Sequence, residues 1–225
     1  MKKIFLVFAL TILFFNKSYA ASGIGAATEY VVTMKQVELC EDSACATSTV
    51  IGSSTMPVDI ASTSAGSDIG SYAATTGLPL GTTYSHLRVT ISRSFTATGS
   101  VTAGSTTCVT DGGTDSTATS MLDADDTGTA VSTTMYLANA ATYNAANGAT
   151  GGSDIPMSYS SPTYATTMTL DGGNMVMIYE LTSPYTVGIK SPLIKVIFNT
   201  NTALGATDDA CVMWLKEPYC QITIQ

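Results

Sequence analysis

The clearest alternation of apolar and polar residues in the chain falls within residues 78–95. Successive side chains of a β-strand point to opposite faces, so this alternation predicts a long strand with one buried face and one solvent-facing side. Arg93 interrupts the apolar row, and we expect it where the strand leaves the core, with its stem packed and its guanidinium in water. The predicted buried residues are Leu87, Val89, Ile91 and Phe95, and the outward-facing ones are His86, Arg88, Thr90, Ser92 and Ser94.

Shorter apolar segments before and after this strand predict further strands. They fall at residues 30–39, 48–51, 56–60, 96–110, 175–181, 185–189, 193–198, 212–215 and 219–224. Segment 193–198 is apolar at nearly every position, which predicts a central strand. Short strands at a spacing of roughly ten residues are typical of an all-β sandwich, and we expect a mostly antiparallel one.

The region of residues 111–154 has a different composition. It is rich in glycine, serine, threonine, alanine and asparagine, with few large apolar residues. We interpret it as a loop-rich insertion in a single domain that covers residues 21–225. The alternative is a boundary between two small β domains, at residues 21–110 and 155–225, although neither half has the strands of a complete sandwich.

The turn that precedes the long strand contains a local motif. Leu78, Gly81, Thr82 and Tyr84 have the spacing of a tyrosine corner, and the segment resembles that of fibronectin type III domains. That family usually has proline directly before the glycine, where this chain has Leu80. The resemblance implies an immunoglobulin-like β-sandwich in which the tyrosine hydroxyl bonds back to the upstream backbone. It implies little about function, because such sandwiches host many unrelated roles.

Residues 1–20 have the features of a secretory signal. Lys2 and Lys3 form a basic start, residues 4–15 form an apolar run, and residues 18–20 form a small-x-small cleavage site. The apolar run is too short to cross a bilayer comfortably, and no later stretch is long enough to anchor the chain. We therefore expect a mature protein that begins near Ala21, is secreted, periplasmic or at the cell surface, and does not insert into a membrane.

Acidic residues outnumber basic ones. Removal of the signal takes away three lysines, which lowers the formal net charge from −8 to −11. The remaining basic residues are scattered, so they form no basic face for nucleic acid. Charged residues make up only 12% of the chain, against about a quarter in ordinary globular proteins. Serine and threonine are abundant instead of charged residues, which favours a β protein with a hydroxyl-covered surface. Such a surface protects the edges of its sheets only weakly against association with other sheets.

The five cysteines fit an exported protein with disulfides. Cys40 and Cys45 are close in sequence, as are Cys211 and Cys220, and we expect each pair to form a disulfide across a local hairpin. Cys108 is then left over. It is either a buried thiol, part of an intermolecular disulfide, or a member of a different pairing. The spacings do not match those of zinc sites.

One acidic segment contains half of a calcium-binding motif. Asp123, Asp125 and Thr127 supply oxygen atoms at alternate positions, and Gly128 permits the sharp turn that brings such ligands together. Thr134 stands where the motif expects its final glutamate. The segment is therefore either a calcium loop or an acidic turn without an ion, and calcium is the one cofactor that the sequence suggests.

Candidate catalytic residues are few. His86 is the single histidine, and the strand pattern places it on the solvent side. No nucleophile-elbow motif surrounds any of the serines. We therefore expect that the protein is not an enzyme.

These features together favour an exported structural or adhesive protein of the cell surface that self-associates as a repeating subunit. Residues 21–27 are the segment most able to add to a neighbour's sheet edge by strand addition. The alternative is a monomeric binding module for a glycan, a peptide or calcium that uses the loops of residues 111–154. The alternation that supports strand addition consists of Ile24, Ala26, Thr28, Tyr30 and Val32.

Overall fold

The structure is a computed structural model that describes residues 21–62, 77–113, 122, 124–137, 154–156, 165–190, 192–208 and 211–224. Every regular element within these ranges is a β-strand, and the ladders between the strands are antiparallel, so the expected all-β, mostly antiparallel class is confirmed. No helix in the described part of the chain is long and apolar enough to cross a membrane. The predicted signal at residues 1–20 and most of the 111–154 region lie outside the described residues.

The strands are β1 (Ser22–Gly25), β2 (Ala27–Cys40), β3 (Ser48–Gly52), β4 (Met56–Asp59), β5 (Thr83–Ala103), β6 (Thr106–Thr110), β7 (Ala124–Asp125), β8 (Thr133–Tyr136), β9 (Asp154–Pro156), β10 (Ala165–Asp171), β11 (Asn174–Thr186), β12 (Ile194–Asn199), β13 (Leu204–Thr207), β14 (Met213–Leu215) and β15 (Tyr219–Ile224). The main sheet follows the order β3-β2-β5-β11-β10-β9, with β4, β6, β7 and β8 at its margins. Strands β1, β13 and β14 form a small sheet, and β12 pairs with β15.

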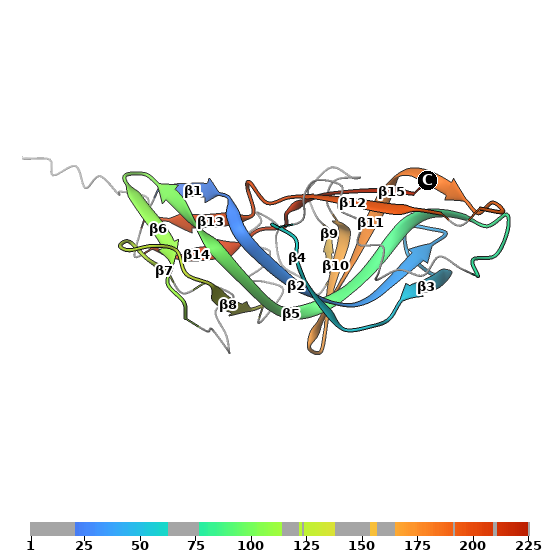
Figure 1. Cartoon of the computed structure of the whole chain (residues 1–225), viewed down its shortest axis with the longest axis horizontal. Coiled ribbons are helices and arrows are strands. Elements are labelled where there is room, and N and C mark those ends of the chain that lie inside the picture. The colour runs from blue at the N-terminus through green and yellow to red at the C-terminus, as the bar shows by residue number, and fades with distance from the viewer. Residues whose placement is uncertain are drawn as a thin grey trace, which may run out of the picture.

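Strand β5 is the longest element and the centre of the main sheet. It has 21 residues and pairs with β2 along one edge. Its other edge pairs with β11 over residues 83–92 and with β8 over residues 94–97. Figure 1 shows β2 and β5 side by side as two long ribbons that curve together, concave toward β12 and β15. The predicted strand is therefore present, and the four residues expected to be buried, Leu87, Val89, Ile91 and Phe95, are buried.

The curvature of β5 has a local cause in its pairing with β2. Val32 lies opposite Phe95, but Met34 lies opposite Ile91, so β5 has extra residues over this interval. A bulge of this kind bends the strand and increases its twist. The main sheet therefore has a concave face that a second layer of strands covers.

Arg93 lies at this bend and has a different role from the expected one. We expected the strand to leave the core here with the guanidinium in water, but β5 continues to Ala103. The guanidinium donates to the carbonyl oxygens of Leu137 at 2.7 Å and Gly172 at 2.6 Å, and it lies 5.1 Å from the centre of the Tyr136 ring. The expectation is wrong because β5 changes partners at this point, and the side chain bridges the interval between β8 and β11.

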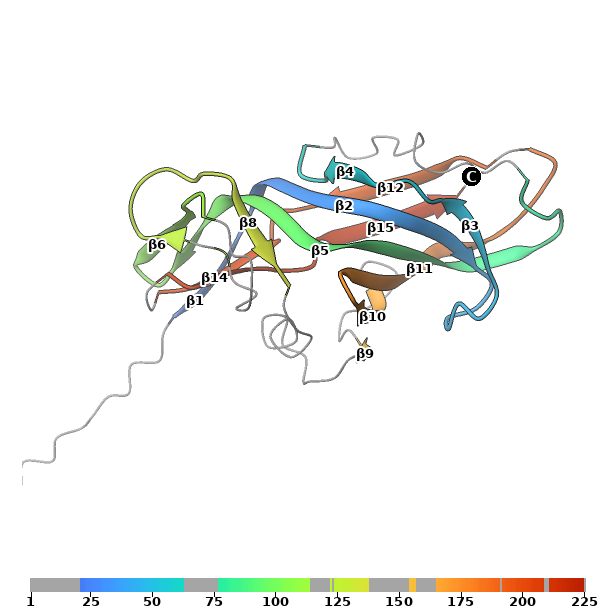
Figure 2. The same cartoon turned by 90° about the horizontal axis from the view of Figure 1, so that it is seen from below.

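The second layer consists of β12 and β15 and crosses the concave face of the main sheet. Figure 2 shows these two strands running in nearly the same direction as β2 and β5, as in the aligned packing of two sheets. On the side of β11, the Thr182 hydroxyl donates to Ile222 O at 3.0 Å. The prediction that residues 193–198 form a central strand is wrong, because β12 has a single ladder partner, β15, in the described part of the chain.

The N-terminal segment pairs within its own chain. Strand β1 is antiparallel to β13, and its two glycines approach the backbone of β5 so closely that a Cβ atom would overlap its carbonyl oxygens. Ile24 is 59% exposed, whereas Tyr30 is 4% exposed. The predicted continuous alternation over residues 24–32 is therefore wrong. A register shift between Ala27 and Glu29 exchanges the two faces.

Two disulfides are present. One joins Cys40 to Cys45 as expected, in the loop between β2 and β3. The expected pairing of Cys211 with Cys220 is wrong, because Cys211 bonds Cys108 of β6 and leaves Cys220 as a buried thiol. Cys211 lies in the turn before β14, next to β6, whereas Cys220 lies on β15 and faces the main sheet. Two disulfides fit an oxidising, extracellular or periplasmic compartment.

Tyr84 is fully buried, but among the described residues its hydroxyl has no bond to the upstream backbone of the kind that the tyrosine-corner resemblance implies. Its partner is the Thr49 hydroxyl on β3, at 2.8 Å. The preceding turn is closed by a backbone bond from Thr82 N–H to Pro79 O. Tyr84 therefore ties β5 to β3 across the main sheet.

Candidate functional site

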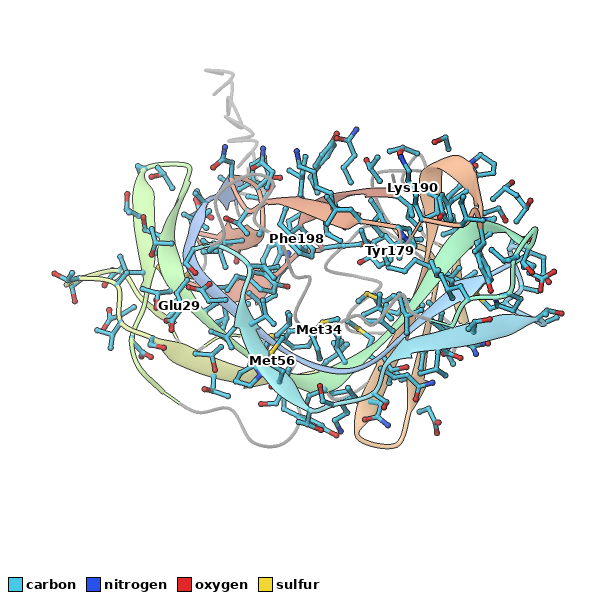
Figure 3. The ribbon with its side chains drawn as sticks, turned by 45° about the vertical axis from the view of Figure 1, so that its right-hand side comes forward. Glu29, Met34, Met56, Tyr179, Lys190 and Phe198 are labelled. Atoms are coloured by element: carbon cyan, nitrogen blue, oxygen red, sulfur yellow. A yellow bond between two sulfur atoms is a disulfide. The ribbon has the colours of Figure 1, made fainter. Side chains whose placement is uncertain are left out.

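Side chains do not completely fill the space between the main sheet and the β12–β15 pair. This space contains a cavity of about 230 Å³ with walls from both layers. In Figure 3, Met34 of the main sheet and Phe198 of β12 lie on opposite sides of this interior. The cavity is the candidate site because it is partly enclosed, mainly apolar and lined by residues from eight different strands.

The floor of the cavity follows from the alternation that the sequence shows. Leu87, Val89 and Ile91 of β5 point to the concave face, and Met175 and Met177 of β11 lie directly opposite Ile91 and Val89. Residues opposite one another in a ladder share a face, so these side chains form one continuous surface. Methionine is flexible and polarisable, so this floor can adapt to the shape of a bound molecule.

The roof of the cavity comes from the second layer. Val196 and Phe198 of β12 and Ile222 of β15 face the main sheet across the interior. Leu193 also lines the cavity but is 54% exposed. Because Leu193 both lines the cavity and contacts solvent, the cavity reaches the surface at this residue. The segment before β12 therefore forms part of the rim of the cavity.

Glu217 is the one carboxyl group among the described residues that line the cavity. It lies in the connection between β14 and β15, which Lys216 N–H anchors by donating to Ala203 O at 2.8 Å. The Tyr30 hydroxyl donates to Lys216 O at 3.3 Å, and Pro218 fixes the backbone after Glu217. These contacts hold the carboxyl group in the interior, where the residue is 6% exposed.

The ionisation of Glu217 reflects this position. Ala165 N–H donates to Oε1 at 2.7 Å, and the Tyr179 side chain also hydrogen-bonds the carboxyl group. Burial raises the pKa of Glu217 from its ordinary value of 4.5 to about 7, because the charged form loses hydration, and these two hydrogen bonds oppose the rise. The group therefore changes charge near neutral pH.

Two further polar groups lie near this carboxyl group. Burial raises the pKa of the Tyr30 hydroxyl and of the Cys220 thiol, and the charge of Glu217 raises both further. Both groups therefore stay protonated at neutral pH and remain donors. We call Glu217, Tyr30, Tyr179 and Cys220 the polar wall of the cavity.

The ion pair of Glu38 and Arg88 lies on the other face of the main sheet. Arg88 donates to both carboxylate oxygens at 2.6 Å, and the Ser48 hydroxyl donates to Oε1 at 2.9 Å. The hydrogen bond with Arg88 lowers the pKa of Glu38, while burial opposes this effect. The pair links β2, β3 and β5, so it stabilises the sheet and does not belong to the cavity.

The predicted calcium loop is described in part. Asp125 Oδ1 accepts hydrogen bonds from Asp126 N–H at 2.6 Å and from the Thr127 hydroxyl at 3.4 Å, and these bonds lower the pKa of Asp125. Asp123 lies outside the described residues. Within the ranges that are described, no three His, Cys, Asp or Glu side chains come together as metal ligands. Calcium binding stays a prediction.

His86 contacts a serine, but in an arrangement that does not activate it. The Ser85 hydroxyl donates to Glu41 O at 2.9 Å and lies 2.8 Å from His86 Nδ1. A histidine that activates a serine accepts the hydroxyl proton, whereas here the bond to Glu41 O directs that proton to a carbonyl oxygen. The absence of enzymatic activity remains a prediction.

The polar wall was not predicted from the sequence. Its members come from β2, β11, β15 and the segment before β15, and only the fold brings them together. One feature of the sequence could have indicated it: Glu217 stands between the apolar segments 212–215 and 219–224, which were predicted as strands. Because a charged residue is seldom fully buried without a partner, a glutamate between two such strands indicates polar groups close to it in the fold.

No protein-family model, no curated protein and no solved structure matches this chain. The geometry of the cavity and the chemistry of its polar wall are therefore the basis for inferring a function.

Proposed function

We propose that this chain is an exported binding protein that holds a small apolar molecule between its main sheet and the β12–β15 pair. The observation that carries the proposal is the cavity of about 230 Å³. An engineered apolar protein cavity of about 150 Å³ stays dry and binds benzene. By the same ratio of volume to atoms, the present cavity suits a molecule of about nine non-hydrogen atoms.

The energetic cost of the cavity supports a binding role. An unfilled cavity destabilises a protein by about 24 cal/mol per Å³, so this one costs roughly 5 kcal/mol. That cost is comparable to the total stability of many domains, about 5–15 kcal/mol. A ligand that fills the space recovers the lost contacts, and the two disulfides offset part of the cost in the empty protein.

The expected compartment agrees with this function. The predicted signal at residues 1–20 directs export, and two disulfides persist where the surroundings are oxidising. We therefore place the protein in the periplasm, at the cell surface or outside the cell. In this proposal the ligand is a small apolar molecule, and the cavity replaces the loops of residues 111–154 as the binding region.

A self-associating structural or adhesive subunit of the cell surface is the second candidate function. Ile24 is 59% exposed on β1, which lies at the edge of the small sheet. An apolar side chain on an edge strand favours strand addition from another copy. The pairing of β1 with β13 of the same chain already uses one of its two edges.

The binding function is tested by thermal unfolding of the mature chain, residues 21–225, with propylbenzene as the probe. A ligand that binds the folded state at about 100 times its Kd adds about 2.7 kcal/mol, so the melting temperature rises by several degrees. The variant Val89→Phe fills the floor of the cavity and abolishes this rise. The matched variant Thr90→Phe places the same ring on the other face of β5 and keeps the rise. An unchanged melting temperature of the wild-type chain, or an equal rise in Val89→Phe, contradicts the proposal.

A further inference from the structure

The polar groups of the cavity are concentrated in one place. Among the described lining residues, Glu217 is the one with a carboxyl group, and none is lysine or arginine. Tyr179 hydrogen-bonds this carboxyl group, and both Tyr30 and Cys220 are close enough for its charge to act on them. The remaining wall is aliphatic, aromatic or thioether, so a bound molecule meets one polar end and an otherwise apolar enclosure.

The polar wall has the composition of a site for an organic cation. A buried carboxylate is costly unless an opposite charge accompanies it, and none of the described residues that line this cavity is a lysine or an arginine. An ammonium group on the ligand would bring the opposite charge to this carboxylate, beside the groups of Ala165 and Tyr179 that hydrogen-bond it. A ligand with its own carboxylate would meet like charge at the same place.

Aromatic rings next to Glu217 add a second attraction. Tyr30 and Tyr179 belong to the polar wall, and the Phe95 ring lies edge-on to Tyr30 with 6.3 Å between the ring centres. The face of an aromatic ring attracts a cation, and the attraction is stronger in a site without water. Carboxylate and rings together therefore favour an ammonium group over a neutral hydroxyl group.

The charge of the whole chain acts in the same direction. The formal net charge is −8, and removal of the predicted signal makes it more negative. An acidic protein concentrates small cations near its surface and repels anions, which raises the rate of cation association. This long-range attraction is independent of the cavity, and it favours the same class of ligand as the polar wall, a cation.

We propose that the ligand of this cavity is a small apolar amine whose ammonium group pairs with Glu217 while its hydrocarbon part fills the space above Val89 and Met177. This inference rests on the proposed binding function and specifies its ligand class. The amine carries one hydrocarbon or aromatic group, because the cavity is too small for a long chain.

The test compares three probes of similar size on the mature, disulfide-bonded chain: 2-phenylethylamine, propylbenzene and 3-phenylpropanoate. The first two have the same number of non-hydrogen atoms and differ in the ammonium group. Titration calorimetry at pH 8 is expected to show at least tenfold tighter binding of the amine than of propylbenzene, and no binding of the carboxylate. At pH 6, amine binding is expected to release a proton from Glu217, seen as a dependence of the heat on the buffer. Tyr30 and Cys220 face the same group and stay protonated, so neither supplies that proton.

Two variants assign the effect to Glu217. Glu217→Gln is expected to lose at least tenfold in amine affinity and to bind propylbenzene within about twofold of wild type, which also shows that the cavity is intact. Glu180→Gln removes one exposed carboxylate from β11 and is expected to bind the amine like wild type. If Glu217→Gln fails to fold, the wild-type comparison of amine with propylbenzene decides.

The outcomes separate this inference from the binding function. Equal affinity of the wild-type chain for the amine and for propylbenzene overturns the amine proposal and leaves the cavity function in place. Tighter binding of the carboxylate, or unchanged amine affinity in Glu217→Gln, also overturns it. If none of the three probes binds, the proposed binding function fails as well.

Discussion

Glu217 is a carboxyl group enclosed by apolar side chains, and its ionisation therefore opposes folding. Hydrogen bonds from neighbouring groups reduce this free-energy cost but do not remove it. Ala165 N–H and the Tyr179 side chain both favour the charged form, yet burial outweighs them and the pKa rises to about 7. A protein under selection for stability alone gains from an apolar residue at this position. The retained carboxyl group is thus consistent with a role in binding.

The raised pKa predicts how stability depends on pH. The folded-state value of about 7 lies above the ordinary value of 4.5, so the folded chain keeps this proton over a range in which the unfolded chain has lost it. Glu217 therefore contributes fully to the free energy of unfolding below pH 4.5, and this contribution is lost as the pH rises to about 7. The loss amounts to roughly 3 kcal/mol. Glu217→Gln is expected to lose less stability than wild type between pH 5 and pH 8, measured as the urea unfolding free energy. Parallel profiles for the two proteins contradict this prediction, and Glu180→Gln serves as the control that keeps the wild-type profile.

At the scale of elements, the two disulfides have different effects on the architecture. Cys40 and Cys45 are 5 residues apart and close a single loop between β2 and β3. Cys108 and Cys211 are 103 residues apart and fix β6 to the turn before β14. The second bond therefore joins the far end of β5 to the C-terminal strands that lead to the cavity roof.

Loop length predicts how much each disulfide stabilises the fold. A bond that closes about 100 residues restricts the unfolded chain by about 4.7 kcal/mol on the loop-entropy estimate, and one that closes about 5 residues by about 2 kcal/mol. Replacement of Cys108 and Cys211 by alanine is expected to lower the free energy of urea unfolding by more than the same replacement of Cys40 and Cys45. Equal losses, or a larger loss for the shorter loop, contradict this order.

At the scale of the whole molecule, the first and the last described strands both pair with other strands of the same chain. Strand β1 pairs with β13 and packs on β5, while β15, the last described strand, forms the roof of the cavity together with β12 (Figure 1). Strands from residues 22–103 thus pair directly with strands from residues 165–224. The proposed ligand-binding function needs one copy of the chain, because the described residues of one copy line the cavity from both layers.

The arrangement of β1 predicts the state of association. The mature chain is expected to have the mass of a single chain by light scattering, because β1 is already paired. Deletion of residues 21–27 uncovers the edge of β13 and the adjacent part of β5, and the shortened chain is expected to self-associate or to unfold at a lower temperature. Oligomers or filaments of the intact chain that disappear after the deletion would favour the structural subunit instead.

The candidate site shows where sequence analysis reaches its limit. The floor residues of β5 were predicted as buried because alternation is a local property of the chain. That Glu217 faces a cavity was not predicted, because the cavity exists only where two layers with separate sequences meet. The Cys108–Cys211 bond was missed for the same reason: nearness in sequence said nothing about the packing of β6 against the turn before β14.

The sequence by itself determined the all-β class, the long central strand and the local Cys40–Cys45 disulfide, because each depends on residues that are close in the chain. The tertiary structure decided the partners of β12, the role of Arg93 at the bend, and the placing of Glu217, Tyr30, Tyr179 and Cys220 around one cavity. Those features depend on how the sheet curves and which face of each layer is covered, and such long-range packing leaves no periodic pattern in the sequence.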